Sequence, residues 1–187
     1  MSDFRDISPL IIDPAGHSKH LLKTLFTTLG VMRVTAVART DEALAAMRSE
    51  VFSIVFCDEM AGPADPFKFL KALRRDLSTC DVTVPVILVS GAADVHKIKA
   101  SRDAGFNDVI AKPVSAGTVE RKLQALLLAP RAFVTAKAFV GPDRRGRSAD
   151  DRRQFGERPP GEDRRGTGGP NVAVFAVAPR LDNDERP

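Results

Sequence analysis

The chain has 187 residues, 43% of them hydrophobic, and a formal net charge of only +4. This is enough for one globular domain with a substantial core, but the remainder is too short for a second. The chain has no run of roughly 18 apolar residues, which excludes a membrane-spanning helix, and its first residues lack the pattern of a secretory signal. Its two cysteines are too few for a disulfide scaffold or a zinc site.

Short apolar runs alternate with helical patterns through residues 7–130. The apolar runs predict five strands, which are Pro9–Ile12, Met32–Ala38, Phe52–Cys57, Val84–Ser90 and Asp108–Ala111. Helices are predicted between and after them by apolar residues at helical spacing. The expected helix signals are Gly30 as the end of the first, Thr40 as the N-cap of the second, an apolar stripe from Phe67 to Leu77 in the third, Gly105 as the end of a fourth over Val95–Ala104, and Ser115 as the N-cap of the fifth.

Strands that alternate with helices imply right-handed crossovers and a parallel sheet that is covered on both faces. The runs IVFC and PVILV are continuously apolar, as expected for strands that are buried on both faces. We therefore predict an α/β fold of the flavodoxin-like type, a (βα)5 doubly wound parallel sheet, with a largely irregular C-terminal extension. Its functional groups should lie at the carboxyl ends of the strands.

Those strand ends hold Asp13, Asp58, Ser90 and Lys112. In this order, and with the segments LIIDPAGHSKHLLKTLFTTLG, FSIVFCDEMAGPADPFKFLKALR, VPVILVSG and VIAKPVS, the chain resembles the CheY-like receiver domain of two-component response regulators over about residues 7–130. The resemblance implies that Asp58 is the phosphoacceptor and that Ser90 and Lys112 contact the phosphoryl oxygens. It also implies a Mg²⁺ site at Asp13 and Asp58.

Two positions depart from that family pattern. The family usually has two adjacent acids after the first strand, whereas this chain has Asp13 followed by Pro14, and proline offers no ligating side chain. We therefore expect a weak or absent Mg²⁺ site. Val109 stands where the family has an aromatic switch residue. Two interpretations stay open: Asp58 is still phosphorylated, weakly or by a dedicated kinase, or the receiver is a degenerate scaffold.

The character of the sequence changes after Pro130. We divide the chain into a receiver (residues 1–130), a mildly apolar connector (131–140), an arginine-rich segment (141–166) and a C-terminal tail (167–187) whose residues 171–178 are apolar. The arginine-rich segment has eight arginines, six acids, five glycines and three prolines. Because such a composition cannot bury a core, we expect it to be disordered until a partner orders it.

The arginine-rich segment repeats the triplet Asp-Arg-Arg three times and contains no lysine. Arginine without lysine favours planar bidentate contacts and stacking over simple charge neutralisation. Guanine suits this mixture, because its O6 and N7 accept a guanidinium and its N1–H and N2–H₂ groups can donate to a carboxylate. A ligand with several guanines and phosphates would use both residue types.

That chemistry matches cyclic di-GMP (c-di-GMP), and the stretch AFVGPDRRGRSAD…GEDRR resembles the extension of CheY-like cyclic di-GMP effectors, the Cle group. By this resemblance the segment binds cyclic di-GMP, either as one molecule or as a stacked pair. The candidate ligand contacts are Arg144, Arg145, Arg147, Asp150, Arg152, Arg153, Arg158, Asp163, Arg164 and Arg165.

The leading hypothesis is a cytoplasmic binding module, and not an enzyme, in which ligand binding orders the tail and controls a protein partner. The family resemblance makes a flagellar motor component or a surface-attachment protein the expected partner. One alternative is a phosphorelay receiver with a passive tail, and Pro14 argues against it. Another is a nucleic-acid-binding receiver, which the six acids of the arginine-rich segment disfavour. No interaction with a membrane is expected.

Overall fold

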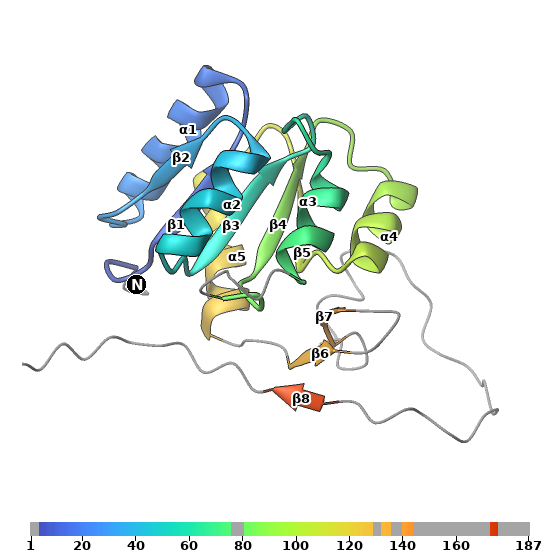
Figure 1. Ribbon diagram of the computed structural model, residues 1–187. Coiled ribbons are helices and arrows are strands. Elements are labelled where there is room, and N and C mark those ends of the chain that lie inside the picture. Colours follow the sequence, from blue (N-terminus) through green and yellow to red (C-terminus); the bar gives the residue numbers. More distant parts are fainter. Residues whose placement is uncertain (1–3, 76–80, 129–131, 136–139, 144–172, 176–187) are drawn as a thin grey trace, which may run out of the picture.

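The computed structural model describes residues 4–75, 81–128, 132–135, 140–143 and 173–175. Its main unit is a parallel sheet in the order β2-β1-β3-β4-β5, with a helix after each strand (Figure 1). The strands are β1 (Pro9–Ile12), β2 (Thr35–Val37), β3 (Ile54–Asp58), β4 (Val86–Ser90) and β5 (Asp108–Ala111). The helices are α1 (Gly16–Thr28), α2 (Thr40–Ser49), α3 (Pro66–Leu73), α4 (Val95–Ala104) and α5 (Ala116–Leu123). The predicted flavodoxin-like fold is confirmed.

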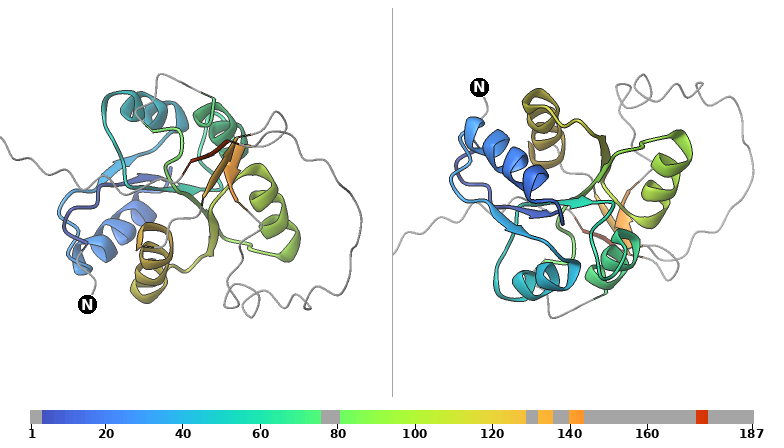
Figure 2. Two further views of the ribbon diagram at one scale, coloured as in Figure 1. Left: turned by 90° about the horizontal axis from the view of Figure 1, so that it is seen from below. Right: turned by 90° about the horizontal axis from the view of Figure 1, so that it is seen from above.

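Helices cover both faces of the sheet, and each face has its own apolar core (Figure 2). On one face α1 and α5 bury Phe26 and Leu123, and the ring of Phe26 meets the ring of Phe56 edge-on at 5.2 Å. On the other face α2 and α3 bury Met47 and Phe69. All residues of β3 and β4 are buried, as their continuous apolar sequences predict. Among the described residues, no helix combines the length and the apolar character needed to span a bilayer.

The predicted strand limits are exact for β1 and β5, too wide for β2 and β4, and shifted toward the N-terminus for β3. The predicted strand Met32–Ala38 shortens to Thr35–Val37, and Met32 is 77% exposed. Phe52 is buried but lies before β3, which instead extends through Asp58. The strand predicted from Val84 starts at Val86, because Pro85 has no N–H group to donate. Apolar runs therefore mark burial and not the exact extent of strand pairing.

Helix signals are mostly confirmed. Gly30 and Gly105 take positive φ angles of 85° and 102° where α1 and α4 end, and the Ser115 hydroxyl accepts a hydrogen bond from the Thr118 N–H at 3.3 Å. The prediction of Thr40 as an N-cap is wrong. Arg39 occupies that position, and the Thr40 hydroxyl donates instead to carbonyls of the β3–α3 loop. Leu77 lies outside the described residues, and α3 ends at Leu73.

A second, smaller sheet follows a π-helical turn, η1 (Gln124–Leu128), that continues α5. It consists of β6 (Phe133–Thr135), β7 (Val140–Pro142) and β8 (Ala173–Phe175), in the order β7-β6-β8 with antiparallel pairing. The segment predicted as a connector (131–140) thus contributes β6 and the first residue of β7, and the first two residues of the predicted arginine-rich segment complete β7. These two antiparallel strands form a hairpin, and the apolar segment at 171–178 contributes β8.

The hairpin is attached to the end of the receiver near α3 and α4 (Figure 1). Phe133 is buried, and the guanidinium carbon of Arg74 lies 5.0 Å from the centre of its ring. A Cβ atom placed on Gly105 would lie 2.8 Å from the carbonyl oxygen of Val140. The hairpin therefore packs against a glycine that α4 already requires as its end.

This contact gives a stability prediction. Gly30→Ala should cost about 1–2 kcal/mol, because alanine is strained at positive φ, while no atom lies within 4 Å of its added Cβ. Gly105→Ala carries the same kind of strain and also meets the Val140 carbonyl, so it should cost at least about 1 kcal/mol more. Urea unfolding of both variants measures the difference, and equal losses would contradict the packing of β7 over Gly105.

Candidate functional site

The carboxyl ends of the strands gather the four residues that the sequence indicated. Asp13 follows β1, Asp58 ends β3, Ser90 ends β4 and Lys112 follows β5. Asp13, Asp58 and Ser90 are buried to within 3% exposure, because the strands that carry them lie between the two helical layers. The parallel topology therefore places two carboxylates, a hydroxyl and an ammonium at one edge of the sheet.

Lys112 pairs with both carboxylates. Its Nζ lies 2.5 Å from Asp58 Oδ2 and 3.6 Å from Asp13 Oδ2. Burial favours the neutral amine, but the hydrogen bond and charge of Asp58, with the charge of Asp13, raise the pKa of Lys112 above its usual value. The other carboxylate oxygens are held by the backbone: Asp13 Oδ1 accepts from the Ala15 N–H at 2.7 Å, and Asp58 Oδ1 accepts from the Met60 N–H at 2.9 Å.

The residues fit a Mg²⁺ ion held by a reduced set of ligands. The Oδ2 atoms of Asp13 and Asp58 are buried and face the Lys112 ammonium. Mg²⁺ keeps several waters and commonly binds through one or two carboxylates together with phosphate oxygens. Pro14 adds no side-chain ligand, and the described residues contain no cluster of three or more His, Cys, Asp or Glu. When bound by these two carboxylates, Mg²⁺ would neutralise charge on a phosphoryl group.

Ser90 has a partner that the sequence analysis missed. Its Oγ donates to Glu59 Oε2 at 2.8 Å, and the Gly91 N–H donates to Glu59 Oε1 at 2.6 Å. Lys97, on α4, completes the group, with its Nζ 2.5 Å from Glu59 Oε2 and 3.4 Å from Ser90 Oγ. The position of Glu59, directly after Asp58, indicated in the sequence that Glu59 lies at the same edge of the sheet. Its pairing with Lys97 follows only from the fold, since Lys97 lies on α4 between β4 and β5.

Glu59 thus occupies the donors at the end of β4. Burial works against its charged form, but the hydrogen bonds from Lys97, the Gly91 N–H and Ser90 outweigh burial and lower the pKa of Glu59 to about 2. Glu59 is therefore ionised at neutral pH. The family resemblance implies that the Ser90 hydroxyl contacts a phosphoryl group. In this structure the Glu59 carboxylate accepts the hydrogen bond of that hydroxyl.

Other side chains of the site support the structure and not the chemistry. Cys57 is fully buried, and burial raises the pKa of its thiol, so it is not a nucleophile. Val109, at the position of the family's aromatic residue, packs partly buried against the core under α2 and α3. The ten candidate ligand contacts from Arg144 to Arg165 lie outside the described residues.

Comparison with known proteins agrees with this geometry. Residues 10–124 match the model of the response regulator receiver domain. The probable transcriptional regulator ycf27 of Pyropia yezoensis is 26% identical over 118 residues, which are 63% of this chain but only 46% of that protein. The chain therefore spans about half the length of the curated relative that it matches.

Two solved structures share the fold. The chemotaxis response regulator CheY4 of Vibrio cholerae has a TM-score of 0.59 and 21% identity, covering 65% of this chain and 98% of that one. The receiver domain of the sensor histidine kinase PA1611 of Pseudomonas aeruginosa, solved with a magnesium ion in its active site cleft, has a TM-score of 0.56 and 22% identity, covering 63% of this chain and 94% of that one.

The Glu59 group predicts a pH-dependent stabilisation. Because the pKa of Glu59 in the folded protein lies below its ordinary value of 4.5, the stabilisation is complete above that value and is lost as pH falls toward about 2. Glu59→Gln should therefore lower the free energy of unfolding by about 1–3 kcal/mol at neutral pH, and the difference from the parent should shrink on acidification. Urea unfolding across that pH range measures it.

The matched control for this variant is Glu50→Gln, which neutralises an exposed glutamate after α2. Its effect should stay small at every pH. A loss in Glu59→Gln that is equally large in acid, or no larger than in the control, would contradict the ion pair with Lys97 and the hydrogen bond from Ser90.

Proposed function

Because the chain belongs to the response regulator receiver domain family, we propose that it is a receiver whose arginine-rich segment binds cyclic di-GMP. Binding orders that segment and thereby controls a protein partner. The observation that carries the proposal is the threefold repeat of Asp-Arg-Arg, without lysine, between residues 141 and 166. The chain acts in this proposal as a binding module that turns over no substrate.

The composition of the segment supports guanine over a general polyanion. Arginine forks pair with guanine O6 and N7 or with phosphate oxygens, and the interspersed aspartates accept from guanine N1–H and N2–H₂. Acids would only weaken a segment that coats nucleic-acid phosphates, since every acid opposes the release of counterions that drives such binding. A segment with eight arginines and six acids is therefore better suited to a compact guanine nucleotide.

The hairpin supports the proposed coupling to the receiver. Asp143, the first residue of the first triplet, donates its N–H to the Ala132 carbonyl at 2.7 Å, next to Phe133 in β6. Phe133 is in turn buried beneath Arg74. The arginine-rich segment thus starts from a fixed point close to α3 and α4, so ordering it would change the surface that these helices offer to a partner. The Cle-group resemblance makes a flagellar motor component the proposed partner.

Phosphorylation of Asp58 is a second candidate input. The specific observation in its favour is the buried Asp58 carboxylate, with the Lys112 ammonium 2.5 Å away. Two features weaken it: Pro14 replaces an acid, and Glu59 already accepts the hydrogen bond of Ser90. A phosphoryl group on Asp58 would have to compete with Glu59 for the Ser90 hydroxyl. Cyclic di-GMP is therefore the input that the chain supports better.

The decisive comparison is between lysine and alanine replacements in the full chain. Replacing the six triplet arginines by lysine preserves charge but removes the bidentate forks, so the affinity for cyclic di-GMP should fall by about tenfold or more, as calorimetry would measure. The alanine series should abolish binding. Unchanged affinity in the lysine series would mean that charge alone, and not bidentate contact, holds the ligand. If the parent chain does not bind cyclic di-GMP at micromolar concentration, the proposal is overturned.

The same titrations separate the nucleic-acid alternative. GTP and a short single-stranded RNA are titrated into the parent chain at several salt concentrations. We expect cyclic di-GMP to bind more tightly than either. RNA binding that is the tightest of the three and falls steeply with salt would favour the nucleic-acid interpretation.

For the second candidate input, Pro14→Asp restores a carboxylate beside Asp13. We expect this variant to bind Mg²⁺ at least about tenfold more tightly than the parent, because it adds an oxygen ligand to the pair Asp13 and Asp58. Phosphorylation by acetyl phosphate, followed by intact-mass spectrometry, should rise with it and disappear in Asp58→Asn. A parent chain that already binds Mg²⁺ and accepts phosphate as well as Pro14→Asp does would restore the phosphorelay interpretation.

A further inference from the structure

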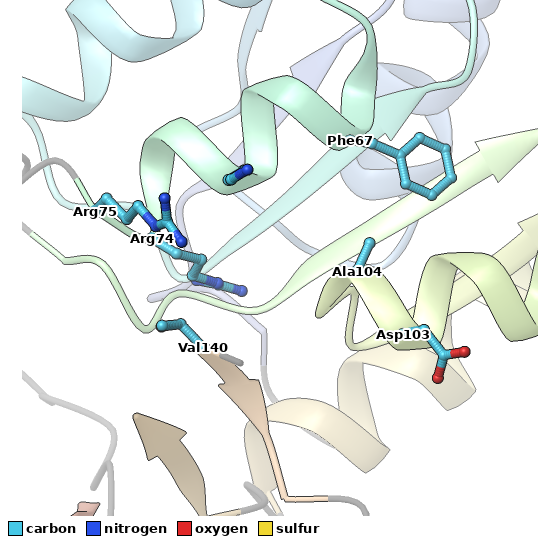
Figure 3. Close-up of a pocket in the computed structure, with 7 residues that line it drawn as sticks. Phe67, Arg74, Arg75, Asp103, Ala104 and Val140 are labelled. Atoms are coloured by element: carbon cyan, nitrogen blue, oxygen red, sulfur yellow. The ribbon is translucent and has the colours of Figure 1, made fainter. Parts of the chain in front are cut away.

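A cavity of about 270 Å³ lies between α3, α4 and β7, away from the carboxyl ends of the strands (Figure 3). Phe67 and Lys71 come from α3, Arg74 and Arg75 from its C-terminal end, Asp103 from α4, and Val140 from β7. The hairpin contributes Val140 to the wall, so the cavity lies where the hairpin meets the receiver. None of the four residues at the receiver site lines it.

The cavity is rich in positive charge. Lys71, Arg74 and Arg75 line it together with one acid, Asp103. Within the part of the chain that the structure describes, none of these three cations forms an ion pair. Lys71 and Arg75 are exposed, so their charged groups are available to a ligand. This arrangement attracts an anion into a partly enclosed space, where charges interact more strongly than in open solvent.

Arg74 adds a buried cation to the wall of this cavity. It is only 5% exposed, and its guanidinium donates to the carbonyls of Val82 and Val84 and to the side chain of Asn107. Its Nε is buried without a hydrogen-bond partner. Burial lowers the pKa of Arg74 to about 9, which still leaves it charged at neutral pH. The charge of Asp81 partly offsets this effect of burial, and an anion in the cavity would stabilise the buried guanidinium further.

The other end of the cavity is aromatic. Figure 3 shows Phe67 at the side opposite Arg75. The ring of Phe67 is held edge-on to Phe106, with 5.4 Å between their centres. An aromatic face and a group of cations in one pocket suit the two parts of a nucleotide, because bases stack on aromatic rings and arginines hold phosphates.

The cavity also lies beside the start of the arginine-rich segment. Val140 is part of its wall, and Asp143, which opens the first Asp-Arg-Arg triplet, follows three residues later. Three residues of chain span at most about 11 Å. A ligand gripped by the first triplet is therefore within reach of Lys71 and Arg75.

We propose that this cavity is a phosphate-binding subsite, in which Lys71 and Arg75 hold one phosphate of a cyclic dinucleotide and Phe67 contacts the adjoining base. The proposal rests on the proposed function and adds a receiver-borne part to the ligand site. The size limits what enters: about 270 Å³ is below the roughly 300–1,000 Å³ of pockets that enclose a drug-sized ligand. The cavity therefore accommodates only part of the dinucleotide.

The test uses the full chain and a matched pair of double variants. Lys71→Ala with Arg75→Ala removes two cavity cations, whereas Lys23→Ala with Arg33→Ala removes the same charges from exposed positions on α1 and before β2. With cyclic di-GMP in calorimetry, the cavity variant should bind about tenfold more weakly or worse, because charge-assisted hydrogen bonds are lost. The control should stay within about twofold of the parent.

The outcomes separate this proposal from the proposed function. If the parent binds cyclic di-GMP and both double variants bind equally well, the subsite is overturned while the function stands. If the parent binds no cyclic di-GMP, the function fails, and pyrophosphate then decides the subsite by backbone NMR. Saturable shifts at Phe67 to Arg75 that vanish in the cavity variant support a phosphate site, and the absence of such shifts overturns it.

Discussion

The burial of β3 and β4 on both faces fixes the framework of the receiver and the positions of the residues at its strand ends. All residues of these two strands are buried between the helical layers, so neither strand can slide or rotate without exposing apolar side chains. Asp58 and Ser90 are the last residues of these strands and are fixed by the same packing. The precision of the receiver site follows from the core and not from the loops that surround it.

At that edge, charged side chains of the chain pair with one another. Lys112 pairs with the two buried carboxylates, and Lys97 pairs with Glu59, which in turn accepts the hydrogen bond of Ser90. The family resemblance implies that a metal ion would pair with the carboxylates, and that a phosphoryl group would pair with Ser90 and Lys112. Ion pairs within the chain engage these groups instead, and this is consistent with an input that acts elsewhere on the molecule.

Sequence reasoning predicted the sheet and the residues at its edge because they depend on local patterns. The apolar runs placed β1 and β5 exactly, and Gly105 marked the end of α4, because the glycine adopts a positive φ that other residues avoid. The Glu59–Lys97 pair was missed because its members are 38 residues apart and meet only through a crossover. The hairpin was missed because its strands are three residues long and gain their stability from pairing and from Phe133 beneath Arg74. Thr40 has the residue type of an N-cap, but contacts with a distant loop decided its role.

The hairpin connects the receiver to the arginine-rich segment, because it packs on the first and leads directly into the second. The central claim is that cyclic di-GMP orders this segment against the receiver, and amide hydrogen–deuterium exchange of the full chain, with and without the ligand, tests it most directly. We expect ligand-dependent protection in residues 141–166 together with residues 67–75, which lie in α3 and directly after it. Exchange that is unchanged in both regions at saturating ligand, or protection confined to the carboxyl ends of the strands, would contradict it.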